Sequence, residues 1–292
     1  MKRYYLFSEL LIDYRKFYQL SQLDFANNIN VDLRTVQRWE KDLTLISSDK
    51  EEDFVLETLM PYQLVRNLNA KVPIPTYYDF KIRKYSLDQF TNDLPKAEWF
   101  KEHINLKSSQ LRHIDFDYDK KYLQKFIKKA KKDSHILNEG LLKRATILLP
   151  ELNNIITSKS GFYSGHLIIL PLKESTYQKL KNRTINNKDL NESDLVDYRN
   201  LDKPIFYCYD ISADCNYTFY YFATAFLRFF KQHDNTDYLF CTYSDRDDGY
   251  ELNTQAGLNI VWEDKELQNE LGTKYPPRFM EGNYRQFLED LN

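Results

Sequence analysis

The sequence predicts an α+β multidomain protein, in which an all-α segment at the N-terminus precedes a mixed α/β domain. Apolar residues recur at helical spacing through roughly the first 60 residues. From residue 109 to residue 262, strand-like and helix-like runs alternate, which is typical of a mixed α/β domain. Between the two patterns lies the segment KVPIPTYYDF, residues 71–80, whose prolines end the helical pattern and favour extended backbone.

The composition is that of an ordinary globular protein, and the 292 residues suffice for about two domains. The net charge of −2 gives no general attraction to nucleic acid, so a DNA-binding function must rest on local residues. Three cysteines without CxxC spacing indicate a reducing, cytoplasmic location without disulfides. Five histidines show no metal-ligand spacing, and no apolar run approaches ~18 residues, so we expect neither a bound metal nor a membrane span.

Four helices are expected in the N-terminal segment. The first helix buries one stripe of residues, namely Phe7, Leu10, Leu11, Tyr14, Phe17 and Tyr18. Ser21, with Asp24 three residues later, forms the capping box of a second helix, and Asp32 caps a third. Ser48 and Glu51 are the expected capping pair of a fourth helix.

The second and third helices, joined by the tight segment NINVD, predict a helix-turn-helix. The third helix buries Val36 and Trp39, and the small Ala26 lets the second helix pass close to it. Arginine and glutamine on the exposed face can bond guanine and adenine edges, and Gln22 is positioned to touch a phosphate. The expected partner is therefore double-stranded DNA. The expected DNA-binding residues are Gln22, Leu33, Arg34, Thr35, Gln37, Arg38 and Lys41.

The stretch SQLDFANNINVDLRTVQRWEKD resembles the XRE family of phage-repressor-type helix-turn-helix domains, over residues 5–60. The residues that fill the family's pattern are Gln22, Phe25, Ala26, Val31, Asp32, Thr35, Val36, Trp39 and Glu40. The resemblance implies an ion pair between Arg15 and Glu40. The segment KDLTLISS that follows Glu40 lacks the family's usual glycine turn. The alternative is a small helical bundle that binds protein, because charged helix faces are usually only solvated.

The C-terminal part predicts several strands, at residues 113–118 (HIDFDY), 166–172 (HLIILPL), 204–212 (PIFYCYDIS), 238–243 and 259–262. Helices are expected over residues 119–132, 138–156 with a bend at Pro150, 219–232 and 248–256. Over roughly residues 109–262 this order resembles the GNAT acetyltransferase superfamily. Its matching features are a strand ending in Pro-Leu before a helix, a strand leading into a long helix, and a closing strand–helix–Gly–strand unit.

The two resemblances imply three segments. Residues 1–70 form a helix-turn-helix DNA-binding domain, residues 71–108 form a linker or connector, and residues 109–292 form a GNAT-like α/β domain with a C-terminal tail. Such a GNAT-like domain would hold the acetyl-CoA pyrophosphate on backbone N–H groups of a glycine-rich turn at a helix N-terminus.

The glycine-rich turn is not found in this sequence. Tyr221 stands in register with its central glycine, and only Ala223 fits the pattern. The family often has a tyrosine general acid four residues before the closing glycine, here Gly257, but that position is Asn253. Tyr250, one helical turn away, is the alternative acid. We therefore expect no catalytic residue and no cofactor, and a domain that serves sensing, dimerisation or partner binding.

Taken together, these patterns predict a cytoplasmic transcriptional regulator, with repression as the expected mode. A homodimer is expected, because helix-turn-helix modules bind two half-sites about one DNA turn, ~34 Å, apart. The C-terminal domain is expected to take an effector or protein partner that the sequence does not identify. One alternative is an active acetyl-CoA-dependent N-acetyltransferase with a DNA- or protein-targeting module, and another is an antitoxin-like interaction protein. The basic run at residues 120–132 is expected to be a solvated helix face, and His166 a core residue.

Overall fold

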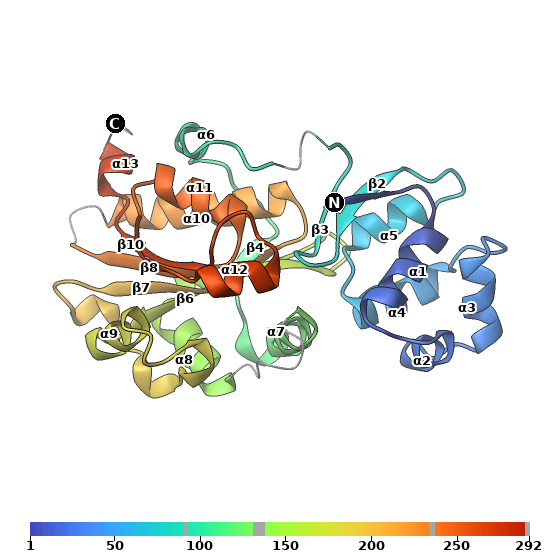
Figure 1. Ribbon diagram of the computed structural model, residues 1–292, viewed down its shortest axis with the longest axis horizontal. Helices are drawn as coiled ribbons and strands as arrows, with labels where there is room; N and C mark the ends of the chain where they lie inside the picture. Colours follow the sequence, from blue (N-terminus) through green and yellow to red (C-terminus); the bar gives the residue numbers. More distant parts are fainter. Residues whose placement is uncertain (90–92, 131–137, 234–236, 290–292) are drawn as a thin grey trace. The chain divides into compact units, whose positions relative to one another are not determined.

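The computed structural model describes residues 1–89, 93–130, 138–233 and 237–289, which form a mixed α/β protein with two sheets (Figure 1). The chain divides into two compact units. Unit 1 comprises Met1–Asn92, Thr157–Gly165 and Ser212–Thr218, and unit 2 comprises Asp93–Ile156, His166–Ile211 and Phe219–Asn292. Each unit is therefore assembled from segments that lie far apart in the sequence.

Helices and a small sheet make up unit 1. Its helices are α1 (Phe7–Phe17), α2 (Gln22–Asn28), α3 (Leu33–Glu40), α4 (Ser48–Thr58) and α5 (Tyr62–Leu68). Its strands are β1 (Lys2–Tyr4), β2 (Thr76–Asp79) and β3 (Lys84–Ser86), which pair in the order β1-β2-β3. Both pairings are antiparallel. The four helices expected from the sequence are present, and α5 and the sheet add to them.

The starts of three helices test the capping predictions. The capping box of Ser21 and Asp24 is present at the start of α2. Asp32 is the N-cap residue of α3, but its carboxylate accepts from the Thr35 hydroxyl (3.2 Å) and not from a backbone N–H. The predicted Ser48–Glu51 pair is wrong, because α4 starts one residue earlier than expected, with Ser47 as its N-cap.

The expected linker at residues 71–80 is partly wrong. Its second half is strand β2, which pairs with β1 on one side and with β3 on the other. Arg3 lies opposite Tyr77, and Tyr78 lies opposite Tyr85. The prolines Pro73 and Pro75 do precede the strand, where a missing N–H costs little. The sequence signal was weak because β1 has only three residues, too few to show alternation.

Residues from far along the chain complete the core of unit 1. Phe162 belongs to the same buried cluster as the side chains of α1 to α5, and its ring stacks on Tyr62 with centroids 4.4 Å apart. The buried Arg83 donates to the backbone oxygens of Tyr163 (3.0 Å) and Ser164 (3.1 Å). The segment 157–165 is thus fastened to the N-terminal helices by both apolar and polar contacts.

Unit 2 contains most of the remaining elements. Its helices are α6 (Ala97–Glu102), α7 (Phe116–Ala130), α8 (Glu139–Leu148), α9 (Glu174–Lys181), α10 (Asn216–Gln232), α11 (Asp247–Gln255), α12 (Lys265–Leu271) and α13 (Arg285–Glu289). Its strands are β4 (Leu111–His113), β5 (Asn154–Thr157), β6 (Tyr163–Leu172), β7 (Ile205–Ala213), β8 (Leu239–Ser244), β9 (Asn259–Glu263) and β10 (Arg278–Gly282). The first residues of β6 and α10 and the last of β5 and β7 belong to unit 1.

The seven strands form one sheet in the order β4-β5-β6-β7-β8-β10-β9. Strands β7 and β8 are parallel, whereas β10 is antiparallel to both of its neighbours. Helices α10 and α11 lie on one face of the sheet, and α8 and α9 lie on the other (Figure 1). Every residue of β6 is buried, as expected for a strand covered on both faces.

Most of the predicted elements of the α/β part are present, with three differences. The helix expected over residues 138–156 ends at Leu148, and residues 154–157 form strand β5. The expected strand at residues 113–118 ends at His113, and α7 begins at Phe116. The part expected to be a tail contains α12, β10 and α13, and β10 inserts between β8 and β9. No described helix combines the length and the apolar character that crossing a bilayer requires.

Candidate nucleic-acid interface

Helices α2 and α3 are joined by a turn of residues 29–32. Asn30 has a positive φ of 52°, and the Val31 N–H donates to the Ala26 oxygen (3.0 Å), which closes the turn. Asparagine tolerates this left-handed conformation better than most residues do. On the inner side Ala26, Val36 and Trp39 are buried, so the two helices share one core. This confirms the expected pair of short, closely packed helices.

The outer face of α3 is basic. Arg34 and Arg38 are exposed and, being four residues apart, lie on one side of the helix, with the exposed Lys41 following at its C-terminal end. Within the described part of the chain, these three side chains make no hydrogen bond or ion pair. Leu33, at the N-terminal end of α3, is 36% exposed. The predicted exposure of Leu33, Arg34 and Arg38 is confirmed, whereas Gln37, expected on the same face, is partly buried.

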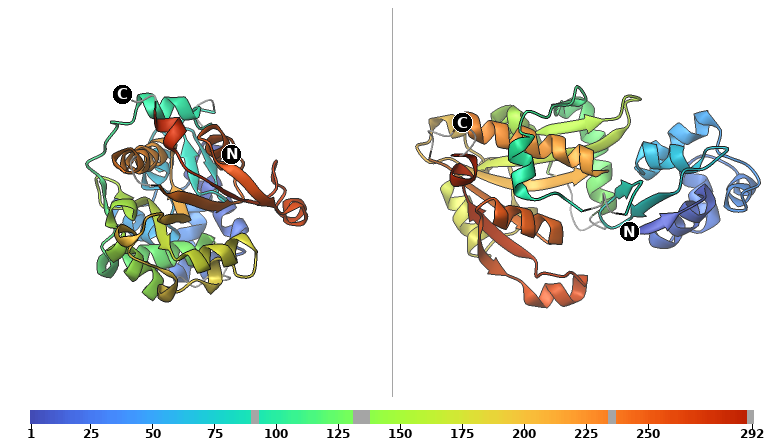
Figure 2. Two further views of the ribbon diagram at one scale, coloured as in Figure 1. Left: turned by 90° about the vertical axis from the view of Figure 1, so that its left-hand side faces the viewer. Right: turned by 90° about the horizontal axis from the view of Figure 1, so that it is seen from above.

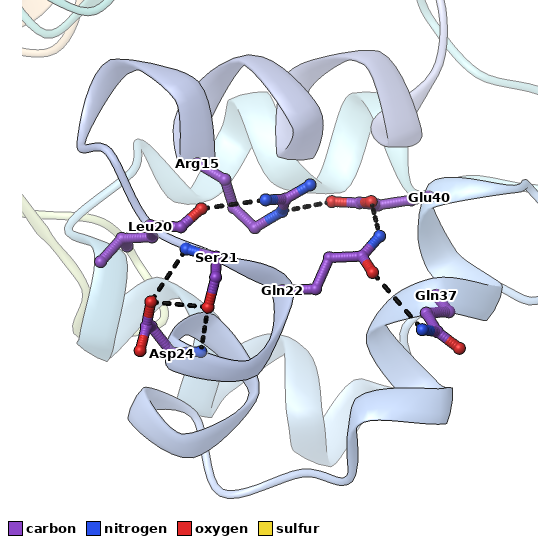
Figure 3. Close-up of polar contacts among 7 residues, drawn as sticks. All are labelled: Arg15, Leu20, Ser21, Gln22, Asp24, Gln37 and Glu40. Atoms are coloured by element: carbon purple, nitrogen blue, oxygen red, sulfur yellow. Dashed lines mark hydrogen bonds and ion pairs between the residues drawn. The ribbon is translucent and has the colours of Figure 1, made fainter.

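A polar network fixes α3 against α1 and α2 (Figure 3). Arg15 donates from Nε to Glu40 Oε1 (2.5 Å) and from Nη1 to the Leu20 oxygen (2.9 Å). Gln22 donates from Nε2 to Glu40 Oε2 (2.5 Å). Both oxygens of Glu40 are therefore engaged, each from a different helix. The Arg15–Glu40 ion pair implied by the family resemblance is present, and its side chains are largely buried.

Three of the predicted DNA-binding residues are partly buried and bonded within the protein. Gln22 is bound to Glu40, and its carbonyl oxygen accepts a long bond of 3.4 Å from Gln37 Nε2 (Figure 3). The hydroxyl of Thr35 donates to Asp32. The seven residues thus separate into an exposed group (Leu33, Arg34, Arg38, Lys41) and an internally bonded group (Gln22, Thr35, Gln37). This separation cannot be inferred from local sequence patterns, because the contact of Gln22 with Glu40 forms only in the folded structure.

The N-terminus of α2 already carries an anionic group. Asp24 accepts from the Ser21 backbone N–H (3.0 Å) and the Ser21 hydroxyl (2.6 Å). These bonds hold the pKa of Asp24 below its ordinary value. A carboxylate in the first turn of a helix complements the helix dipole, so this end has little attraction left for a phosphate. Phosphate contacts near α3 would have to come from basic side chains such as Lys41.

The turn between β7 and α10 is the place at which a GNAT-like domain is expected to carry its cofactor loop. Helix α10 begins at Asn216, so Tyr221 lies inside the helix, beyond its first turn, where it packs against the core of unit 2. Asp214, before the helix, is buried and accepts from the Thr218 hydroxyl (2.7 Å). Burial raises the pKa of this carboxyl. The side chain of Tyr217, by contrast, is 69% exposed.

Cys215 and Tyr250, the other residues near the expected site that could take part in catalysis, are both packed within the protein. Burial, followed by the nearby Asp214, raises the pKa of Cys215 to about 11, which keeps the thiol protonated and a poor nucleophile at neutral pH. Tyr250 stacks on the guanidinium of Arg278 (4.4 Å). Gly257, expected to close α11, has a φ of 98°, a conformation that favours glycine.

Other sequence signals give no second candidate interface. His166 is fully buried, as expected, and its Nε2 lies 3.4 Å from Asp210 on β7. The basic run at 120–132 extends beyond the described residues, and its described part lies on α7. Among the described residues, no group of histidine, cysteine and carboxylate side chains is arranged to hold a metal ion. Comparison of the chain with models of known families, with curated proteins and with solved structures returns no match.

Proposed function

We propose that this chain is a sequence-specific DNA-binding transcriptional regulator of the XRE-like helix-turn-helix type, which inserts α3 into the major groove. The observation that carries the proposal is the two-sided character of α3. Arg34 and Arg38 are exposed and unpaired within the described residues, whereas Val36 and Trp39 anchor the opposite side in the core. A helix held in this way presents a rigid reading face, and the major groove, about 12 Å wide, admits an α-helix.

The exposed residues differ in the part of DNA that they can contact. Each arginine can donate two parallel hydrogen bonds to guanine O6 and N7, and Leu33 offers an apolar contact for a thymine methyl. Lys41 supplies a phosphate contact, which sets register without reading sequence. The network of Arg15, Gln22 and Glu40 fixes the angle between α2 and α3 before DNA arrives, so binding orders few groups.

For the C-terminal part, we propose a GNAT-like domain without transferase activity. The succession of β7 and α10, and of β8, α11, Gly257 and β9, supports the GNAT-like part of this proposal. The buried carboxyl of Asp214 beside the start of α10, with Tyr221 packed in the core, supports the lack of a pyrophosphate site. We propose that the chain acts in the cytoplasm as a homodimer, probing two half-sites ~34 Å apart, and that it represses transcription.

Selection of binding duplexes from a random-sequence pool, followed by fluorescence anisotropy, tests the proposal. We expect enrichment of a paired motif, and Arg38→Ala should weaken binding to it by about 1–3 kcal/mol while affecting random duplex much less. Arg38→Lys keeps the charge but loses the bidentate geometry, so it should resemble the alanine variant in specificity. Lys71→Ala, an exposed charge outside α3, is the control. Failure to enrich any motif would contradict the proposal.

A further inference from the structure

One arginine of unit 2 is buried without acceptors for most of its donors. Arg278, the first residue of β10, is 0% exposed. Its Nε donates to the Pro276 oxygen (2.6 Å), but within the described residues Nη1 and Nη2 have no hydrogen-bond partner. A guanidinium carries five N–H donors, and leaving them unsatisfied in a buried place is costly. The guanidinium of Arg278 therefore has two terminal nitrogens, at the start of β10, that are free to donate hydrogen bonds.

The groups around Arg278 stabilise its charge without satisfying its donors. The rings of Tyr250 (4.4 Å) and Tyr275 (5.4 Å) lie beside the guanidinium as cation–π partners, and they also pack on each other, with centroids 4.6 Å apart. Two of the nearby carboxylates, Asp247 and Glu251, bond to the segment of residues 274–275. Asp247 accepts from the backbone N–H groups of Lys274 and Tyr275, and Glu251 accepts from Lys274 Nζ and the Tyr275 hydroxyl. These bonds hold the carboxylates on the segment beside the arginine.

The segment of residues 272–275, next to this arginine, is exposed or partly exposed. It follows α12, which lies at the outer end of the β9–β10 hairpin (Figure 2). Gly272 ends α12 with a φ of 64°, a conformation that most other residues would not adopt. Tyr275 is attached to α11 through its backbone N–H and its hydroxyl, and it remains partly exposed. Outward movement of this ring would open a path to the guanidinium.

We propose that Arg278, Tyr250 and Tyr275 form a binding site for a small organic carboxylate with a planar body. The two free terminal nitrogens match the two oxygens of a carboxylate, which a guanidinium binds through two parallel hydrogen bonds. The tyrosine rings contact the planar body of the ligand. Asp247 and Glu263 act electrostatically on Arg278 and so lie close enough to repel a second negative charge, which favours a monoanion over a phosphate dianion.

This site is independent of the proposed DNA binding, since it lies wholly within unit 2. Burial lowers the pKa of Arg278, and an anion bound to it would offset that cost. Because the ligand binds only the folded chain, it should raise the unfolding temperature in a saturable manner.

The experiment measures thermal unfolding of the full chain in rising benzoate, with acetate, inorganic phosphate and chloride compared at equal ionic strength. We expect a saturable stabilisation by benzoate, weaker by acetate, and no more by phosphate than by chloride. Arg278→Lys should weaken benzoate binding at least about 10-fold, because lysine lacks the planar fork. The matched control is Arg183→Lys, which changes an arginine paired with Asp264 in the same unit.

Three outcomes would overturn the proposal: equal stabilisation by all four anions, stronger binding of phosphate, or unchanged benzoate binding by Arg278→Lys. Glu263 lies opposite Arg278 on β9. If the two side chains pair, the guanidinium has no free donors for a ligand, and benzoate should then stabilise the chain no more than chloride does. If Arg278→Lys does not fold, the proposal is tested on the wild-type chain by chemical modification. Benzoate should then slow modification of Arg278 by phenylglyoxal at least a few-fold, with Arg183 as the internal reference, and a lack of protection refutes the site.

Discussion

Replacement of Phe162 by alanine should destabilise unit 1, although this residue is remote in the sequence from the helices of that unit. Phe162 is 6% exposed, belongs to the core of unit 1 and stacks on Tyr62. Truncation of a buried phenylalanine costs about 3–5 kcal/mol, which includes the cavity that remains. Stacking with Tyr62 adds about 0.5–1.5 kcal/mol beyond the area buried, so the upper half of that range is expected.

The unfolding of unit 1 can be followed separately from that of unit 2. The chain has three tryptophans, of which only the buried Trp39 lies in unit 1. In a background with Trp99 and Trp262 replaced by phenylalanine, urea unfolding monitored by fluorescence reports on unit 1 alone. The control is Phe17→Ala, since Phe17 is also stacked on a ring, that of Phe80, but is 37% exposed.

We expect Phe17→Ala to cost less than Phe162→Ala, about two-thirds as much, in proportion to the area that each ring buries. A loss below about 1 kcal/mol for Phe162→Ala would refute the reasoning, because it is less than any well-packed phenylalanine contributes. A fragment of residues 1–92 should for the same reason be much less stable than unit 1 in the full chain.

Three further predictions concern charged groups and the cofactor. Glu40→Gln removes the ion pair with Arg15 but keeps the volume, so it should lower the free energy of unfolding by about 1–3 kcal/mol and weaken DNA binding; equal stability in urea would contradict this. The pKa of Asp214 is raised in the folded state, so its ionisation opposes folding increasingly as pH rises from the unfolded to the folded pKa. Asp214→Asn should therefore gain stability relative to wild type between acidic and neutral pH, and a constant difference across pH would count against it. Titration of acetyl-CoA up to millimolar concentration should give no measurable heat and no acetyl transfer, since Tyr221 and Asp214 leave no anion site at the start of α10; saturable micromolar binding would overturn that expectation.

The helical pattern of the N-terminal segment was predictable because its signals are local. The capping box of Ser21 and Asp24 and the buried positions of α1, α2 and α3 depend on residues within a few positions of one another. The same is true of the exposed arginines. The interaction of Gln22 with Glu40 connects residues eighteen positions apart, and a sequence pattern does not specify such a contact.

The sheet of unit 1 and the position of β10 were not predictable for a different reason. Strands β1 and β3 have three residues each, so neither contains a full period of alternation that distinguishes strand from loop. Strand β10 is longer, but it follows a segment with Pro276 and Pro277, which is typical of a loop or tail. Phe162 belongs to unit 1 because it packs against Tyr62, and a contact between residues so far apart in the chain cannot be read from a local sequence pattern.

The division of unit 1 among three stretches of the chain has a consequence for synthesis on the ribosome. The helices that carry Arg34 and Arg38 emerge first, but Thr157–Gly165 and Ser212–Thr218, which belong to the same unit, are made much later. At usual elongation rates this delay is on the order of ten seconds. We expect α2 and α3 to remain incompletely stabilised throughout that interval. If these helices bind DNA as proposed, chains that end before residue 218 would compete poorly for operator sites.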